Sequence, residues 1–238
     1  MSPPRLWTDL RRFTQARVAL GRAGNAVPTA AHLAFQADHA AARDAVYAAL
    51  DVEALRRDLG TQAPLVHSAA PDRATYLLRP DLGRMLSPDC RLTPTPGCIA
   101  IVIADGLSAI AVQRHAAPLI AAMGHIGPVV IATQARVALG DDIGALLQAE
   151  AVLVLIGERP GLSAADSLGA YLTWQPRRGR TDAERNCVSN IRPEGLPIAD
   201  AALKLNWLIG AMRRLQLSGV ALKDEQPRYD RSISVEIT

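Results

Sequence analysis

The stretch CIAIVIADG, residues 98–106, decides the fold expected for this chain. Its aliphatic run is unbroken, which is typical of a strand buried on both faces of a sheet. A segment with helical spacing, SAIAVQRHAAPLIAAMG (108–124), follows it, and PVVIATQ (128–134) is a second apolar strand. DDIGALLQA (141–149) and AVLVLIG (151–157) repeat the pattern, so strands and helices alternate.

This alternation predicts an α/β fold with a Rossmann-like, mostly parallel sheet covered by helices. RLTPTPG (91–97) marks a boundary, because two prolines and a glycine suit neither a helix nor a central strand. We therefore expect a helical N-terminal segment over residues 1–95 and a Rossmann-like domain over 96–238. Pro28 and Thr29 supply a helix start signal in the first of these.

Composition argues against several classes of protein. The net charge is only +3, with 26 basic residues dispersed among 23 acidic ones, so nucleic-acid binding is not expected. Cys90, Cys98 and Cys187 form no C-x-x-C pair and are interpreted as intracellular thiols. No apolar stretch approaches the roughly 20 residues that span a bilayer, and MSPPRLWTDLRRF lacks the apolar core of a secretion signal. A cytoplasmic protein without membrane contact is predicted.

Sheets of this kind bind ligands beyond the carboxyl ends of their strands. The predicted ends carry the segments 105–108, 134–136 and 157–159. ADGLSAI has one glycine where a dinucleotide fingerprint needs three, and no P-loop is present. The five histidines show no i, i+4 pairing, so a protein-supplied metal is not predicted. No catalytic residue is predicted in this chain either.

The polar residues at these ends have structural interpretations as well as functional ones. Ser108 lacks a nucleophile elbow and is favoured as a helix N-cap, while Asp105 can accept hydrogen bonds from turn amides. His115 is favoured as a solvent-facing or hydrogen-bonded side chain. Glu158 either contacts a ligand or forms an internal bridge to Arg159.

Six ordered motifs cover most of the chain, from about Leu10 to the region of Met212. They are LRRFTQARVALGRAGNAVPT, HLAFQADHAAARDAV, YLLRPDLGRML, VIADGLSA, LIGERPGLSAADSLGAYL and ERNCVSNIRPEGLP. In this order they resemble the small-subunit (light-chain) family of ethanolamine ammonia-lyase. A single motif such as DGLSA is weak, but the ordered set is highly specific.

The resemblance implies a carbon–nitrogen lyase that converts ethanolamine to acetaldehyde and ammonia by a radical mechanism. Adenosylcobalamin would lie between this chain and a large barrel subunit, which would hold the substrate, and the protein supplies orientation. The family's cofactor contacts fall on Val137, Glu158 and Cys187. Val137 would give apolar or backbone contact, Glu158 a hydrogen-bond acceptor and Cys187 a small loop contact. Packaging in a bacterial microcompartment is left open.

A different class also fits the polar strand ends. A stand-alone nucleotide- or sugar-binding α/β protein could place Asp105, Gln134 and Glu158 on its ligand. A scaffold without a ligand would leave these clustered polar residues unexplained. A subunit should expose an apolar contact surface, whereas a stand-alone protein should behave as a soluble monomer.

Overall fold

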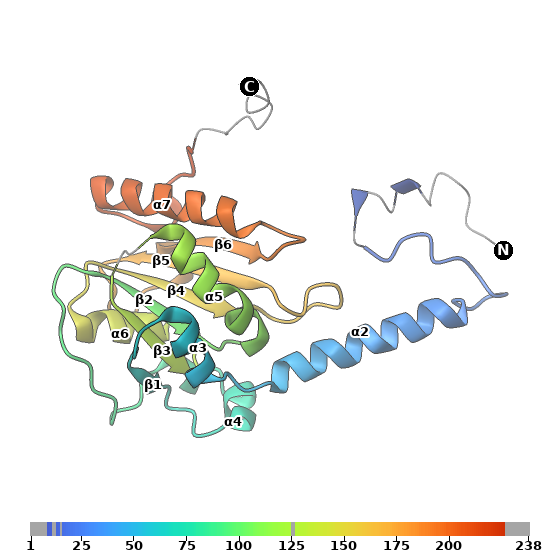
Figure 1. Cartoon of the computed structure of the whole chain (residues 1–238), viewed down its shortest axis with the longest axis horizontal. Helices are drawn as coiled ribbons and strands as arrows, with labels where there is room; N and C mark the ends of the chain where they lie inside the picture. Colours follow the sequence, from blue (N-terminus) through green and yellow to red (C-terminus); the bar gives the residue numbers. More distant parts are fainter. Residues whose placement is uncertain (1–8, 11–12, 15, 125–126, 227–238) are drawn as a thin grey trace.

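The computed structural model describes residues 9–10, 13–14, 16–124 and 127–226, and its centre is one six-stranded sheet (Figure 1). The strands are β1 (Leu65–His67), β2 (Ile99–Ala104), β3 (Val129–Thr133), β4 (Ala151–Gly157), β5 (Leu168–Trp174) and β6 (Arg185–Ile191). Their spatial order is β1-β3-β2-β4-β5-β6. The central position of β2 and β4 agrees with their continuous apolar sequences.

Helices cover both faces of this sheet. The α-helices are α2 (Thr29–Tyr47), α3 (Val52–Leu59), α4 (Arg73–Leu78), α5 (Ala109–Met123), α6 (Leu139–Leu147) and α7 (Ile198–Leu215). Short 3₁₀ turns are η2 (Leu82–Arg84), η3 (Asp182–Glu184) and η4 (Gly219–Ala221). None of the helices within the described ranges is both long and apolar enough to cross a membrane.

The α/β class is confirmed, but the prediction of a mostly parallel sheet is wrong. β1, β3, β2 and β4 pair in parallel, whereas β5 runs antiparallel to both β4 and β6. The connection from β4 to β5, residues 158–167, contains no helix. A parallel return would need a longer crossover, so the chain turns back directly and the sheet is mixed.

Two apolar layers form because successive side chains of a strand point to opposite faces. Ile101 and Ile103 of β2 belong to the core under α5 and α7, while Val102 belongs to the core under α6. Leu55 of α3 joins the first layer and Val66 of β1 joins the second. The central strands are thereby buried on both faces.

The N-terminal part of the chain is not purely helical. α2 begins at Thr29 directly after Pro28, as the start signal predicts. β1, however, lies inside the expected helical segment 1–95 and pairs with β3. A short strand flanked by Pro64 and Ser68 gives almost no periodic signal, which is why the sequence did not reveal it. A domain division at residue 95 remains a prediction.

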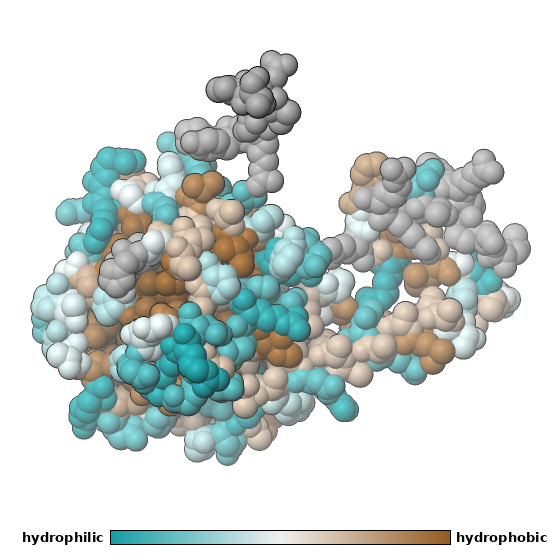
Figure 2. Space-filling model, in the orientation of Figure 1, coloured by the Kyte–Doolittle hydropathy of each residue, from teal (hydrophilic) through white to brown (hydrophobic). Residues whose placement is uncertain are grey.

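α2 extends away from the sheet like an arm (Figure 1). Only Ala42 and Ala45 near its C-terminal end are buried, while Leu33 and Phe35 are 57% and 41% exposed. Figure 2 shows tan and brown residues along this arm. A helix gains most of its stability from packing against other surfaces, not from its own hydrogen bonds in water. The exposed apolar side chains of α2 are therefore available to contact another surface.

A buried ion pair joins α6 to the start of β6. Arg185 donates from both terminal nitrogens to the two carboxylate oxygens of Asp141, each at 2.7 Å. Both side chains are almost completely buried, with 2% and 3% exposed. The neighbouring Asp142 makes a similar pair with Arg178, but the Arg178 side chain is 74% exposed.

These two pairs give a matched test of burial. Arg185→Met should lower the free energy of unfolding by about 3–5 kcal/mol, because it leaves the Asp141 charge buried without a partner. Arg178→Met should lower it by about 1 kcal/mol or less, because that cation is mostly in water and the Asp142 carboxylate keeps the hydrogen bond from the Leu86 amide. Urea denaturation measures both, and equal losses would contradict the assignment of the Arg185 pair as the structural one.

Candidate functional site

Asp105, directly after β2, contacts both the loop after β3 and helix α4. Its two carboxylate oxygens accept hydrogen bonds from the backbone amides of Gln134 and Ala135, each at 3.0 Å. Arg73 of α4 lies 3.4 Å from the same carboxylate. Burial raises the pKa of Asp105, while the Ala135 and Gln134 amides and Arg73 oppose that rise. The expectation that Asp105 accepts turn amides is confirmed.

Two glycines let the loops after β2 and β4 meet. The amide of Leu107 donates to the carbonyl of Gly157 at 2.9 Å. A Cβ on Gly157 would lie 2.0 Å from the carbonyl oxygen of Ser108, and one on Gly106 would lie 2.2 Å from the carbonyl oxygen of Gly157. Gly106 also has φ +58°, which side chains rarely tolerate. The strand ends therefore adjoin, as the parallel order of β2, β3 and β4 predicts.

A hollow of about 370 Å³ opens at these strand ends. Val137 and Glu158, two of the residues predicted from the family resemblance, line it. An adjoining hollow of about 510 Å³ shares Leu107, Arg136 and Arg159 with the first and reaches His39 and Arg43 of α2. We call the two together the strand-end hollow. Its first part is lined by Tyr76, Gly106, Leu107, Arg136, Val137, Ile156, Gly157, Glu158, Arg159 and Tyr171.

Tyr76 and Arg136 form one wall of the strand-end hollow. Tyr76 is fully buried, and its hydroxyl donates to the carbonyl of Ala135 at 3.0 Å. The guanidinium of Arg136 lies 4.3 Å from the ring centre and that of Arg73 lies 4.9 Å from it. Burial raises the pKa of Tyr76, so its hydroxyl stays protonated. No single residue in the sequence indicates this wall of the hollow, although Tyr76 is the first residue of the motif YLLRPDLGRML.

Two buried polar atoms near the hollow have no hydrogen-bond partner among the described residues: Arg136 Nε and Gln134 Oε1. Gln134 sits in the left-handed region with φ 53°, which is uncommon for a residue other than glycine. Most buried polar groups in native proteins are paired. Arg136 lines both parts of the strand-end hollow, whereas Gln134 lines neither.

Glu158 is held from β5 and β6 rather than by its neighbour. Its Oε2 accepts hydrogen bonds from the Ser167 hydroxyl and, at 3.3 Å, from the Asn190 amide. Oε1 accepts none within the described part of the chain, so one carboxylate oxygen keeps its acceptor capacity. No ion pair links Glu158 to Arg159 in that part of the chain, and the predicted internal bridge is wrong.

Cys187 lies next to the hollow without lining it. It is exposed on β6 and is the cross-strand partner of Tyr171, which does line the hollow. Desolvation by surrounding protein atoms raises the pKa of the Cys187 thiol; the Glu158 charge adds to this, and a hydrogen bond with Tyr171 opposes it. A protonated thiol is a poor nucleophile. Cys187 is thus placed for a contact and not for a reaction.

Ser108 and His115 take structural roles. The Ser108 side chain accepts the amide of Ala111 as the N-cap of α5 and donates to the carbonyl of Ala165 at 2.7 Å, so the N-cap prediction is confirmed. His115 is buried, and its Nε2 lies 3.6 Å from an Asp166 oxygen and has no hydrogen-bond partner in the described part of the chain, so the prediction of a solvent-facing or hydrogen-bonded side chain is wrong. Neither residue lines the strand-end hollow.

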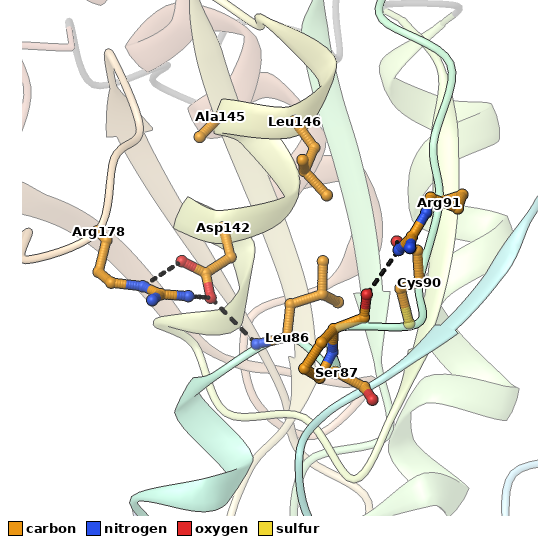
Figure 3. A pocket seen from close by; sticks show the side chains of 9 residues that line it. Leu86, Ser87, Cys90, Arg91, Asp142, Ala145, Leu146 and Arg178 are labelled. Carbon is orange, nitrogen blue, oxygen red and sulfur yellow. Dashed lines mark hydrogen bonds and ion pairs between the residues drawn. The ribbon is translucent and has the colours of Figure 1, made fainter.

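Another pocket, of about 360 Å³, lies between α6 and the segment 86–91 (Figure 3). Asp142 projects into it, but Arg178 and the amide of Leu86 already occupy its oxygens. None of the three predicted contact residues lines this pocket. The strand-end hollow is therefore the stronger candidate for a ligand.

Comparison with known proteins agrees with the sequence motifs. The family model for the ethanolamine ammonia-lyase light chain (EutC) matches residues 4–223. An ethanolamine ammonia-lyase small subunit from Bradyrhizobium diazoefficiens is 55% identical over 240 residues, covering 94% of this chain and 92% of the relative. Subunits of the same name from Xanthomonas campestris pv. campestris (strain B100) and Azotobacter vinelandii are each 53% identical, covering 95% and 92% of this chain and 91% and 88% of their own lengths. With matches of this extent and identity, the chain belongs to the ethanolamine ammonia-lyase light-chain family.

Proposed function

We propose that this chain is the small subunit of an adenosylcobalamin-dependent ethanolamine ammonia-lyase, and that its strand-end hollow forms one wall of the cofactor site. The observation that carries the proposal is the meeting of Val137 and Glu158 in one hollow, with Cys187 beside it. These positions are far apart in the sequence.

The residues of the hollow fit a large ligand that carries both amide groups and apolar surface. Glu158 Oε1 can accept from an amide, and the Arg136 guanidinium can donate. Val137, Leu107 and the ring of Tyr171 supply apolar contact. The two parts of the hollow, about 370 and 510 Å³, have the size of pockets for drug-sized molecules, roughly 300–1,000 Å³, and a corrinoid is larger than such molecules. The chain therefore supplies one wall, and a partner must supply the rest.

Bound adenosylcobalamin would supply the radical chemistry through homolysis of its cobalt–carbon bond. The residues of this chain would bind and orient the cofactor. Glu158 is fixed by Ser167 and Asn190, so its free oxygen stays in position without rearrangement. Asp105 holds the loop after β3 and helix α4 beside the end of β2. The Tyr76 ring packs against the Arg136 guanidinium. Carbon–nitrogen cleavage of ethanolamine would take place on the large subunit.

The α2 arm is the surface we assign to the large subunit. It exposes Leu33 and Phe35 and contacts the body of the protein mainly through its C-terminal end. Its inner end also borders the strand-end hollow through His39 and Arg43. A partner that packs on the arm would at the same time close the open side of the hollow, which links assembly to cofactor retention.

Glu158→Gln tests the cofactor contact. Glutamine keeps the size of the side chain but weakens a charge-assisted hydrogen bond that contributes about 1.5–3 kcal/mol. The affinity of the assembled enzyme for adenosylcobalamin should fall roughly tenfold to a hundredfold. Titration of the purified complex with the cofactor measures this.

Arg114→Gln is the matched control for Glu158→Gln, because Arg114 pairs with Asp166 at the surface and lies outside the hollow. It should leave cofactor affinity unchanged. Thermal melting of the cofactor-free complexes measures stability independently of cofactor binding. A lower melting temperature with unaltered affinity for Glu158→Gln would refute the ligand role of this carboxylate.

Leu33→Asp together with Phe35→Asp tests the arm. Buried apolar anchors in interfaces commonly contribute 2 kcal/mol or more, so association with the large subunit should weaken by about thirtyfold or more. Val220→Asp is the control, since Val220 is 71% exposed but lies in η4, away from α2. Co-purification of tagged large subunit measures the effect. Undiminished binding by the α2 variant would move the interface to another surface.

The isolated chain should not deaminate ethanolamine, with or without adenosylcobalamin, because its strand-end residues form no acid, base and nucleophile set. The reconstituted pair should produce acetaldehyde only when the cofactor is added. A coupled assay for acetaldehyde measures both. Turnover by the isolated chain would contradict the proposed division of labour between the subunits.

A further inference from the structure

A second cluster of chemically active side chains lies at the end of β1, outside the strand-end hollow. His67 is the last residue of β1, and Asp89 and Cys90 belong to the short turn that starts at Ser87. One ligand atom from each of the three side chains lies within 4.8 Å of the other two. It is the only group of this kind among the residues that the structure describes.

The His67 ring is oriented with one nitrogen free. Nδ1 lies 2.9 Å from the Ser68 carbonyl oxygen, which can only accept, so Nδ1 carries the hydrogen. Nε2 then presents a lone pair or a second proton toward Asp89 Oδ2, 3.4 Å away. A histidine whose other nitrogen donates to a backbone carbonyl is the usual arrangement of a metal ligand.

The backbone fixes Cys90 beside His67. The His67 amide donates to the Cys90 sulfur at 3.5 Å, and that sulfur lies 3.6 Å from the His67 carbonyl. The amides of Ser87 and Cys90 bond to the carbonyls of His67 and Ser87, which connects the turn to the strand. Cys90 also lies at the edge of the pocket in Figure 3. The three side chains are therefore held together by main-chain hydrogen bonds.

We propose that His67, Asp89 and Cys90 bind a zinc-class divalent cation, with solvent at the fourth position. A tetrahedron with metal–ligand bonds of about 2.0 Å has an edge of about 3.3 Å, which agrees with the distance between Nε2 and Oδ2. One imidazole, one carboxylate and one thiolate suit Zn²⁺ or Co²⁺ better than Mg²⁺ or Ca²⁺, which prefer oxygen alone. The bound ion would clamp the segment 87–90 to β1.

No sequence pattern indicates this site, because its ligands come from two separated segments and show no i, i+4 histidine spacing. It also differs from the proposed cofactor function: none of the three residues lines the strand-end hollow. The competing explanation is a surface ion pair between protonated His67 and Asp89, with Cys90 uninvolved. That explanation predicts no binding of a metal.

Cobalt substitution distinguishes the metal site from the surface ion pair. The full-length chain is treated with chelator and titrated with Co²⁺, and absorption is recorded in the thiolate-to-cobalt charge-transfer and tetrahedral ligand-field regions. We expect one cobalt ion to bind per chain with both sets of bands. Cys90→Ser should abolish the charge-transfer band, and His67→Ala and Asp89→Asn should each weaken Co²⁺ binding by at least about tenfold.

Cys187→Ser is the control, because that thiol is also exposed but lies on β6. It should leave the spectrum unchanged. Asp89 is well exposed, so Asp89→Asn should preserve folding, and circular dichroism checks this for every variant. Zn²⁺ should also raise the melting temperature of the wild-type chain but not that of Cys90→Ser. The absence of a thiolate band, or a band that survives Cys90→Ser, would overturn the proposal.

Discussion

The carboxylate of Asp105 is the constraint on which the arrangement of the strand ends depends. It is buried, yet it accepts two backbone amides from the loop after β3 and faces Arg73 from α4. Burying a carboxylate is costly unless such donors surround it. Each of these segments is therefore held where it meets the others. The hollow beside them therefore has a defined shape.

The antiparallel half of the sheet is as important for the site as the parallel half. Because β5 returns beside β4 and β6 beside β5, Ser167 and Asn190 reach Glu158, and Cys187 comes opposite Tyr171. A fully parallel sheet would have separated these residues by crossover helices. The mixed sheet thus explains why Cys187 and Glu158, which are distant in the sequence, lie on the same surface.

Membership of the light-chain family gives the exposed features of this chain a common explanation. A wide hollow with unpaired polar atoms and a protruding apolar helix are both costly for a protein that acts alone. Each becomes favourable if a second subunit covers the arm and a large cofactor fills the hollow. The stand-alone nucleotide- or sugar-binding interpretation accounts for the hollow but leaves the α2 arm without a role.

The sequence by itself determined the α/β class, the strands β2, β3 and β4, the N-cap at Ser108 and the family, since these depend on local periodicity, short-range hydrogen bonds and ordered motifs. Through resemblance it also predicts Val137, Glu158 and Cys187 as cofactor contacts. Only the tertiary structure decided the direction of β5, the place of β1 in the sheet and the partners of Glu158. These depend on contacts between residues distant in sequence, where the length of a connection and the geometry of a buried surface, rather than residue preference, select the outcome. The cluster of His67, Asp89 and Cys90 belongs to the same group, because hydrogen bonds between two separate backbone segments bring its members together.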